Sequence, residues 1–473
     1  PIVTAMSAEA SDMSSYLLMG LPGLAYLAGV AEVGWTAIGL AIGTYLNWLI
    51  VAKRLRRYTA KVGAITIPSF FSRRYKDQRN VLSCIAAVVI LIFFVPYTAS
   101  GFKAIGTLFN SLFGVDYHTT MIIGAAVVIG YTVLGGFLAV STTDLIQSIV
   151  MTSALVVLVI YGVHTAGGLD NVLENAKGIE NYLSFTSTRT AEGEAVSFGG
   201  LSIISTLAWG LGYFGMPHIL LRFMAIDDKN KVKISRRIAS VWVVLAMGVA
   251  VFIGIIGNAL TVNGTVAPLE TSSKAETIVL EMATVLSKHS VGAALIAGLI
   301  FAGILACTMS TSDSQLLAAS SSMSENLLKG VFHIKLSEKQ SMIAARAVLL
   351  IIAVLGIVLA WDQNSSVFRV VSFAWAGFGA AFGPVILCSL FWKRCNEYGA
   401  LAGVISGGAV ALLWAYVPTA IWGADNLPGI FTVYEIIPGF IVSLALIFIV
   451  SLATKAPSKE VIEEFESVKT ADV

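Results

Sequence analysis

Hydroxyl and carboxylate side chains interrupt an apolar run near the start of the chain, in the stretch SAEASDMSSYLLMGLPG at residues 7–23. The run is otherwise apolar enough to cross a bilayer, where every backbone N–H and C=O must find a partner. A broken helix is tolerated there only where its freed groups are buried in protein or line a cavity. Asp12 favours a binding site, because a carboxylate near the membrane centre costs about 2.5 to 3.5 kcal/mol on insertion scales. Its natural partner is a cation; alternatively, the serines bond to their own helix and Asp12 faces a watered interface.

A second polar stretch, CTMSTSDSQLLAASSS at residues 307–322, carries more hydroxyls than a lipid-facing helix tolerates. Ser310, Asp313 and Ser314 share one helix face through i+3 and i+4 offsets, and Thr311 borders Ser314. Hard cations such as Na+ prefer oxygen ligands, which hydroxyls and freed carbonyls supply without the desolvation cost of several carboxylates. The alternative is a packed helix with serines bonding across the interface, and Asp313 argues against it.

The stretch WGLGYFGMPH at residues 209–218 matches GxGxxG by letters alone. A dinucleotide site would need a preceding strand and a later acidic residue for the ribose, whereas these glycines lie inside an apolar span and end at Pro217. We therefore expect them to break a helix. Interrupted spans at the first and sixth positions are typical of inverted repeats that hold a substrate near the membrane midplane, which pairs spans 1–5 with spans 6–10.

Asp144 opens the predicted fifth span at its cytoplasmic end. It is either an N-cap favoured by the helix dipole or a cation contact on the cytoplasmic side. Four aromatic residues fall near the predicted breaks: Tyr16, Tyr97, Trp209 and Tyr213. Together they could close over an apolar ring while their polar tips bond a carboxylate, although each one alone is equally well explained as core.

The composition is that of an integral membrane protein. Of 473 residues, 57% are hydrophobic and 12% charged, against about 25% charged in soluble domains. The net charge of +2 predicts no nucleic-acid partner, and the four cysteines show no CxxC spacing for zinc or a disulfide framework. The sequence contains no GxxxxGK[ST], HExxH or GxSxG motif. The sequence therefore lacks the residues that ATP-driven pumping and hydrolysis require. It predicts secondary transport, with no enzymatic activity and no organic cofactor.

The elements that position these residues are apolar stretches of about 20 residues, the length that crosses a bilayer. Twelve are predicted, at 4–29, 32–52, 80–109, 118–138, 142–164, 198–223, 238–261, 290–326, 341–361, 366–391, 398–417 and 432–453. None alternates as a barrel strand does. The predicted fold class is therefore an all-α polytopic membrane protein.

The distribution of Lys and Arg predicts the orientation of these spans. Placing residues 53–79 in the cytoplasm puts 23 basic residues inside, six of them between Arg222 and Arg237, and four outside. Two long outer loops follow, at 165–197 and 262–289. We expect them to act as lids, with an amphipathic stretch at 274–286 on the membrane surface. The acidic tail from residue 454 is too short for a globular domain.

Six motifs carry a resemblance to a known family: ASDMSSYLLMGLPG (10–23), GGFLAVSTTD (135–144), WGLGYFGMPHIL (209–220), MSTSDSQLL (309–317), SFAWAGFGAAFGP (372–384) and YEIIPGF (434–440). Through them the chain resembles the solute:sodium symporter family nearly end to end. The resemblance implies a LeuT-type five-plus-five inverted repeat preceded by one more helix. Because no charged segment precedes the first apolar run, that N-terminal helix is expected to be absent from this sequence. The expected parts are repeats at 1–164 and 198–391, two further helices at 392–453 and a cytoplasmic tail at 454–473.

The resemblance also implies the binding residues. Na+ is expected at the carbonyls of Ala10, Met13 and Cys307 and the hydroxyls of Ser310 and Thr311, with an essential carboxylate at Asp12. L-Proline is expected among Ser14, Ser15, Tyr16, Tyr97, Trp209, Tyr213 and Ser314. Related sialic acid carriers imply a second cation at Asp144, Asp313 and Ser314. Tyr16, Ser314 and Glu9 differ from the Trp, Cys and Gly of the best-known enterobacterial member, and Asp313 also departs from it.

The prediction from the sequence is thus a Na+-driven importer of L-proline in the inner membrane of a bacterium, embedded in the lipid bilayer and requiring no oligomer. A carrier of another small amino acid or carboxylate keeps the mechanism and changes the solute. A transporter-like membrane sensor is a second alternative, although the short tail offers no kinase or receiver domain. A channel is the weakest alternative, since no repeat suggests a selectivity filter.

Overall fold

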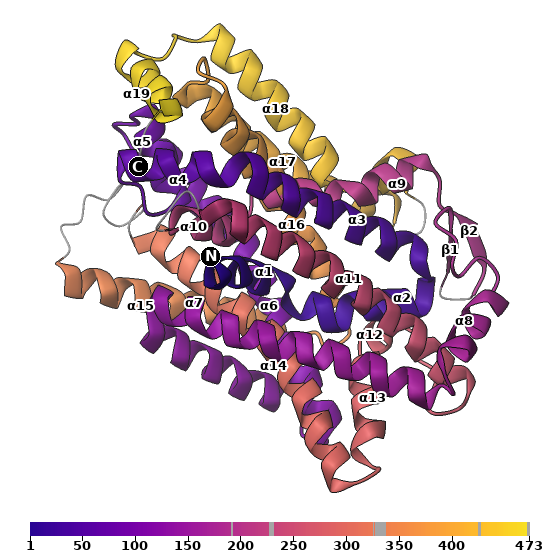
Figure 1. Cartoon of the computed structure of the whole chain (residues 1–473). Coiled ribbons are helices and arrows are strands. Elements are labelled where there is room, and N and C mark those ends of the chain that lie inside the picture. Colours follow the sequence, from indigo (N-terminus) through magenta and orange to yellow (C-terminus); the bar gives the residue numbers. More distant parts are fainter. Residues whose placement is uncertain (191–192, 227–230, 325, 327–336, 424–426, 471–473) are drawn as a thin grey trace.

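The computed structural model describes residues 1–190, 193–226, 231–324, 326, 337–423 and 427–470, which fold almost entirely into helices (Figure 1). Three residues of the basic count, Lys229, Lys329 and Lys335, lie outside the described residues, as do residue 325 of the eighth predicted span and 471–473 of the tail.

The first half of the chain forms α1 (Ile2–Ser15), the π-helix η1 (Tyr16–Gly20), α2 (Leu21–Ala28), α3 (Val30–Leu46), the π-helix η2 (Asn47–Ala52), α4 (Lys53–Val62), α5 (Ile67–Tyr75), α6 (Val81–Phe113), α7 (Tyr117–Thr165) and α8 (Leu169–Gly178). An antiparallel hairpin of β1 (Ser187–Arg189) and β2 (Ala195–Ser197) follows, with Thr188 opposite Val196. The second half forms α9 (Gly200–Leu207), the 3-10 helix η3 (Ala208–Phe214), α10 (Pro217–Met224), α11 (Val232–Val262), α12 (Ser272–Ala275), α13 (Ile278–Ser287), α14 (Val291–Ser322), α15 (Glu338–Leu359), α16 (Val367–Phe391), α17 (Glu397–Trp422), the 3-10 helix η7 (Gly429–Thr432), α18 (Ile436–Ala453) and α19 (Lys459–Thr470).

Nine helices among the described residues are long and apolar enough to cross a membrane, or ten if the bent pair Gly200–Phe214 and Pro217–Met224 is one span. The sequence predicts twelve spans. With the bent pair counted as one span, the structure has two fewer, and this difference arises in two places. The first predicted span is divided among α1, η1 and α2. The fourth and fifth share α7, whose 49 residues would extend about 74 Å at 1.5 Å per residue, more than twice the hydrocarbon thickness. The helix α7 is therefore long enough for two spans.

Gly136 divides α7, because its backbone (φ 65°, ψ −174°) leaves helical geometry there. The sequence placed this division at residues 139–141, a few positions later. Only glycine adopts this backbone region without strain, since a side chain there costs about 1 to 3 kcal/mol. No neighbouring atom of the described residues lies within 4 Å of the position that a Cβ would take, so the requirement for glycine is conformational.

We expect Gly136→Ala to lower the free energy of unfolding by about 1 to 3 kcal/mol through backbone strain alone. Gly130 is the matched control, because it lies on the same helix with equally open surroundings and an ordinary helical backbone. Alanine there should raise stability by up to about 1 kcal/mol. Thermal denaturation of both purified variants in detergent measures the difference, and equal shifts would show that the break at Gly136 does not matter.

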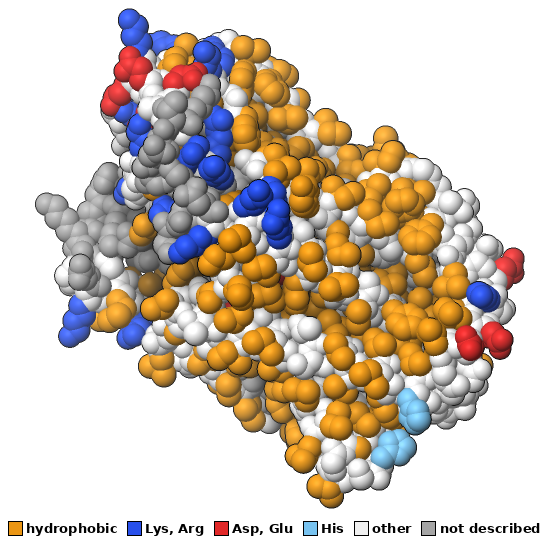
Figure 2. Space-filling model, in the orientation of Figure 1, with side chains coloured by type: hydrophobic (Ala, Val, Ile, Leu, Met, Phe, Trp, Pro, Cys, Tyr) orange, Lys and Arg blue, Asp and Glu red, His pale blue; other side chains and the backbone are white. Residues whose placement is uncertain are grey.

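The surface separates into an apolar middle and charged ends. Figure 2 shows Lys and Arg gathered at the end of the molecule formed by α4, α5 and α19, and hydrophobic side chains over the body beside it. Large apolar side chains such as Leu134, Leu138 and Val291 are exposed. A continuous apolar surface of this extent is stable in lipid rather than in water, which agrees with the membrane assignment and with basic loops on one side.

Two segments outside the predicted spans are helical. Residues 53–79 contain α4 and α5, and the tail forms α19, which packs on them. Phe465 of α19 lies between two guanidinium groups, 5.1 Å from that of Arg54 and 4.9 Å from that of Arg74. Lys76 of the α5 end pairs with Glu460 of α19. The acidic tail is therefore a docked helix, held by the basic residues that the orientation rule places in the cytoplasm.

The expectation that residues 274–286 lie on the membrane surface is wrong. They form α12 and α13, and Ile278, Met282 and Leu286 of α13 are buried. Ile278 lies against Gly257 of α11 and Met282 against Gly162 of α7. The segment is apolar on more than one face, so it packs between helices instead of floating at an interface.

Close backbone contacts fix α3 against the break at η3. A Cβ on Gly43 would lie 2.3 Å from the carbonyl oxygen of Gly210, and one on Gly39 would lie 2.4 Å from that of Leu207. These glycines let the two backbones touch. As a result η2, which continues α3, is held beside η3 and α1.

Candidate functional site

The predicted break in the first span is confirmed at Ser14, whose backbone angles are φ 47° and ψ −171°. This conformation is strained for a residue with a side chain, which is typical of functional sites. Its freed groups have partners: the Ser14 N–H donates to Thr311 Oγ1 of α14 at 3.0 Å, and Ser14 Oγ accepts from the Tyr16 N–H at 3.1 Å. The hydrogen bond to Thr311 therefore holds the break in α1 against α14.

Four of the five oxygens predicted for Na+ lie together between α1 and α14. Ser310 Oγ donates to the carbonyls of Ala10 at 2.8 Å and Cys307 at 3.1 Å, and Thr311 Oγ1 donates to Cys307 at 3.1 Å. All four residues are buried. The fifth, the Met13 carbonyl, accepts from the Tyr16 N–H. A buried set of neutral oxygens suits a monovalent hard cation, whose hydration it can replace without adding net charge.

Asp12 stands beside these oxygens and bonds in other directions. Its Oδ2 accepts from the Tyr213 hydroxyl at 2.5 Å, and its backbone carbonyl accepts from the Tyr97 hydroxyl at 3.3 Å. The carboxylate therefore ties the break in α1 to η3, and its carbonyl ties it to α6. No hydrogen bond joins it to Ser310 or Thr311 among the described residues.

A small cavity of about 10 Å³ lies within the predicted solute site. It is lined by Asp12, Met13, Tyr16, Leu40, Tyr97, Trp209, Met247, Val371 and Trp375. A cavity of this size holds at most one water molecule, so the lining must separate before a solute can enter. Of the predicted solute residues, Tyr16, Tyr97 and Trp209 line this cavity, and Ser14 is bonded to Tyr16. Ser15 Oγ is buried and has no hydrogen-bond partner in the part of the chain that the structure describes.

An aromatic layer closes the cavity on one side. The ring of Trp209 lies 5.5 Å from Tyr16, 5.5 Å from Phe368 and 5.3 Å from Tyr434. Its backbone carbonyl accepts from Trp375 Nε1 at 2.7 Å. Offset ring contacts of this kind contribute about 0.5 to 1.5 kcal/mol each beyond their buried area, so the layer is stable but can be opened.

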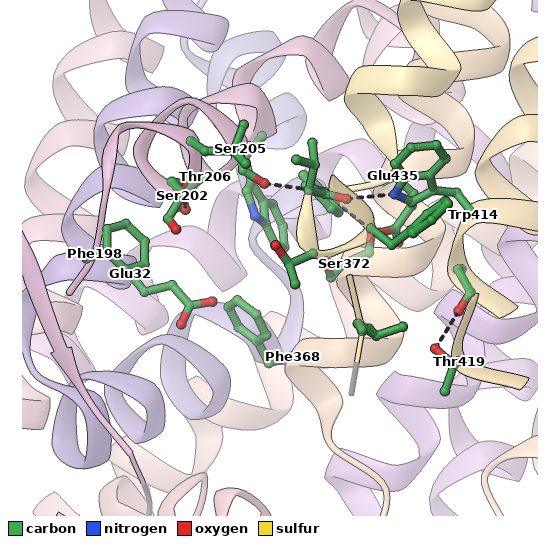
Figure 3. Close-up of a pocket in the computed structure, with 18 residues that line it drawn as sticks. Glu32, Phe198, Ser202, Ser205, Thr206, Phe368, Ser372, Trp414, Thr419 and Glu435 are labelled. Atoms are coloured by element: carbon green, nitrogen blue, oxygen red, sulfur yellow. Dashed lines mark hydrogen bonds between the residues drawn. The ribbon is translucent and has the colours of Figure 1, made fainter. Parts of the chain in front are cut away.

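Beyond the aromatic layer is an outer cavity of about 490 Å³ (Figure 3). Trp209, Phe368 and Tyr434 form part of its wall, and the carboxylates of Glu32 and Glu435 line it. Figure 3 shows Glu32 extending toward Phe368. The ring of Trp209 therefore forms a wall that the outer cavity and the small cavity share.

A third cavity, of about 560 Å³, lies among α10, α14 and α15. Its lining is mainly apolar, and Arg222 and Ser314 are among its polar members. The outer cavity shares Trp209 with the small cavity of the predicted solute site, whereas the cavity beside α15 shares no lining residue with it.

Arg222 makes the main buried ion pair of the described residues, with Asp144. Its Nη2 donates to Asp144 Oδ2 at 3.0 Å and to Ser314 Oγ at 2.5 Å, and its Nε donates to Ser7 Oγ at 3.1 Å. Arg222 is 3% exposed and Asp144 is fully buried. Ser7 also donates to Asp144 at 2.6 Å. The guanidinium therefore joins α1, α7, α10 and α14 at one point.

This geometry corrects two predictions. Arg222 was counted among cytoplasmic loop residues, but it is buried in α10. Asp144 was a candidate N-cap, but it lies inside α7, eight residues after Gly136. Both are drawn inward because each neutralises the other, which is the condition under which ionisable groups persist inside a membrane protein.

Asp313 and Ser314 lie beside this ion pair. The Tyr131 hydroxyl donates to Asp313 Oδ2 at 2.5 Å, and Ser314 Oγ donates to Asp313 Oδ1 at 3.2 Å. Asp144, Asp313 and Ser314 are thus brought together as predicted, with Arg222 among them. Ser314, predicted to contact the solute, is absent from the lining of the small cavity and lines the cavity beside α15 instead.

The family model of sodium:solute symporters matches residues 1–407. The chain belongs to the sodium:solute symporter family. It is 43% identical over 468 residues to the high-affinity proline transporter PutP of Bacillus subtilis, covering 98% of this chain and 93% of that protein. It is 41% identical over 468 residues to the sodium/proline symporter of Escherichia coli, covering 98% of this chain and 88% of that protein. The family resemblance drawn from the motifs is confirmed.

Among solved structures, a Na+-coupled sialic acid symporter in a substrate-bound outward-open state matches this sodium:solute symporter with a TM-score of 0.76. The match covers 97% of this chain and 91% of that one at 19% identity. At that identity the likeness concerns the fold alone. It confirms the predicted all-α, LeuT-type class, while the division into repeats remains a prediction.

Sequence reasoning missed Arg222, Tyr131, Phe368, Trp375 and Tyr434 of this sodium:solute symporter. A signal existed for Arg222, since it stands in the apolar run PHILLRFM directly after the predicted break, where a charge is costly unless it is paired. The aromatic residues carried no such signal, because an aromatic residue in an apolar span looks like any other core residue.

Proposed function

We propose that this sodium:solute symporter imports L-proline together with Na+, by alternating access, across the plasma membrane of a bacterium. The observation that carries the proposal is the buried oxygen set of Ala10, Cys307, Ser310 and Thr311 at the break of α1, next to a small aromatic-lined cavity. The names of the relatives, proline transporters at 41% and 43% identity over nearly the whole chain, support proline as the solute.

Na+ is a substrate in this cycle. The proposed ligands are the carbonyls of Ala10, Met13 and Cys307 and the hydroxyls of Ser310 and Thr311. The ion replaces hydrogen bonds that these groups make to one another, so its binding holds the broken α1 against α14. Asp12 adds negative potential nearby and anchors the break through Tyr213.

The solute site is proposed to consist of Ser14, Ser15, Tyr16, Tyr97, Trp209 and Tyr213. An apolar ring such as that of proline packs against the aromatic faces, while freed backbone groups and hydroxyls of the α1 break bond its charged ends. Ser314 is proposed to support Arg222 instead of touching the solute. Asp144 is proposed as a supporting carboxylate, because the Arg222 guanidinium supplies its positive charge. Asp313 is also proposed as a supporting carboxylate, held by the hydroxyls of Tyr131 and Ser314.

Alternating access is proposed to use the two barriers around this site. Toward the outer cavity, Trp209 and Phe368 must separate from Tyr16. Toward the cavity beside α15, the contacts of Arg222 with Ser7 and Asp144 must loosen. We propose that residues 1–164 and 198–391 are the two inverted repeats whose relative movement does this, with 392–453 and the tail at 454–473 outside the repeats.

Ser310→Ala and Thr311→Ala test the ion site. Each removes one proposed ligand oxygen, and we expect the Na+ concentration for half-maximal uptake to rise about 5- to 100-fold, since an unmade interaction of this kind costs about 1 to 3 kcal/mol. Uptake at saturating Na+ should change much less. Labelled proline uptake into proteoliposomes holding only the purified protein provides the measurement.

Ser320→Ala is the matched control, because Ser320 is a buried serine of α14 whose hydroxyl donates to its own helix, at Leu317. It should leave the Na+ requirement unchanged. If Ser310→Ala and Thr311→Ala also keep the native value, the ion binds elsewhere. Competition by other amino acids and carboxylates tests the solute, and absence of uptake in proteoliposomes would favour a sensor.

A further inference from the structure

A second group of buried oxygens lies where α1 meets η2 and η3. Glu9 and Asp12 are three residues apart on α1, so their side chains share a face. Trp48 Nε1 of η2 donates to Glu9 Oε1 at 3.0 Å, and the Tyr213 hydroxyl of η3 donates to Asp12 Oδ2 at 2.5 Å. Asn47, next to Trp48, donates its Nδ2 to the Tyr213 carbonyl at 2.9 Å. Glu9 is thus bonded to η2, Asp12 to η3, and Asn47 joins η2 to the backbone of η3; we call these three residues the Glu9 cluster.

Each member of the Glu9 cluster keeps one oxygen without a hydrogen-bond partner among the described residues: Glu9 Oε2, Asp12 Oδ1 and Asn47 Oδ1. Glu9 is 1% exposed, Asp12 6% and Asn47 0%. All three atoms are acceptors in the ionised and amide forms. A buried acceptor left unpaired costs about 1 to 3 kcal/mol, and more if it is charged. The cluster therefore offers three unpaired acceptor oxygens, and no described residue supplies a hydrogen-bond donor or a positive charge to them.

No described Lys or Arg side chain pairs with Glu9 or Asp12. Arg222 of α10, which also contacts α1, is bonded to Asp144, Ser7 and Ser314 instead. Trp48 and Tyr213 donate one hydrogen bond each to the two carboxylates. Two ionised carboxylates on one face of a buried helix without a cation would be strongly destabilising.

We propose that Glu9, Asp12 and Asn47 bind a second Na+, between α1, η2 and η3. The ligands are oxygens only, as a hard cation prefers, and two of them carry the charge that neutralises the ion. The site is distinct from the neutral oxygens that α1 shares with α14. Its place in transport rests on the proposed function and makes that function a symport with two ions, but its occupancy can be measured without any transport.

Binding of radiolabelled Na+ to the purified full-length protein tests the site. The wild type should bind two Na+ at saturation, and Glu9→Gln should bind one. Glu281→Gln is the matched control, since Glu281 is a carboxylate of α13 remote from the cluster, and it should bind two. Asn47→Ala keeps both carboxylates and should weaken the second ion at least 5-fold while leaving the first unchanged. Retained binding of labelled proline shows that each variant is folded.

A wild type that binds one Na+, lost in Ser310→Ala and kept in Glu9→Gln, would overturn this inference and leave the proposed function intact. So would a Glu9→Gln variant that still binds two, or K+ that displaces one of two ions as effectively as unlabelled Na+. If the wild type binds no Na+ and transports nothing, the proposed function itself fails.

Discussion

Arg222→Met is expected to lower the free energy of unfolding by about 3 to 5 kcal/mol and to abolish uptake, because it leaves Asp144 buried without a cation. Arg222 also bonds Ser7, Ser314 and the His218 carbonyl, at 2.8 Å for the last. Four helices thus lose their common contact. Thermal denaturation in detergent measures the stability, and proline uptake into proteoliposomes measures the activity.

Two further variants separate charge from packing in this prediction. Lys233→Met removes a positive charge from the exposed start of α11 and should change stability by no more than about 0.5 kcal/mol. The double variant Arg222→Met with Asp144→Leu removes both charges and should regain much of the lost stability but not the uptake. If the double variant also transports normally, the Arg222–Asp144 pair is a structural contact and does not form the barrier toward the cavity beside α15.

Asp12→Asn is expected to raise the Na+ concentration for half-maximal uptake about 100-fold. Two unit charges roughly 6 Å apart interact by about 3 kcal/mol at an effective dielectric constant of about 20. Asn keeps an oxygen for the Tyr213 hydroxyl, so the bond from η3 at 2.5 Å in the wild type can persist. The expected loss of Na+ affinity therefore measures the contribution of the Asp12 charge, which attracts Na+ both at the oxygens shared with α14 and at the Glu9 cluster.

Asp12→Glu keeps the charge and shifts it by about one methylene, and we expect it to keep most of the Na+ affinity because the attraction changes slowly with distance. Asp116→Asn is the control. The Thr119 backbone N–H holds the pKa of the Asp116 carboxyl below its usual range, so this variant also loses a full negative charge at neutral pH, before α7 and away from the site. Native Na+ dependence in Asp12→Asn would reduce Asp12 to a structural role.

The sequence by itself determined the membrane class and the places where helices break. Apolar length is a local property, and a polar interruption of an apolar run has few solutions in lipid, so the run at residues 7–23 and the glycines after Trp209 could be interpreted without knowing their neighbours. The bends at Ser14 and between η3 and α10 are where these patterns predicted them. The residues of the ion and solute sites came from family resemblance, and the structure brings most of them together.

The tertiary structure alone decided which charges meet. Arg222 and Asp144 are 78 residues apart, and Ser7 and Asp144 are 137 apart, so no local pattern distinguishes this Arg222 from the loop residues with which it was counted. The same holds for α13, which was expected at the surface, and for α19, which docks on α4 and α5. Glu9 and Asn47 could likewise be recognised as a candidate site only from the contact of α1 with η2, in which Trp48 donates to Glu9. The free energy of a buried polar group depends on the partner that faces it, and that partner is supplied by packing between distant segments.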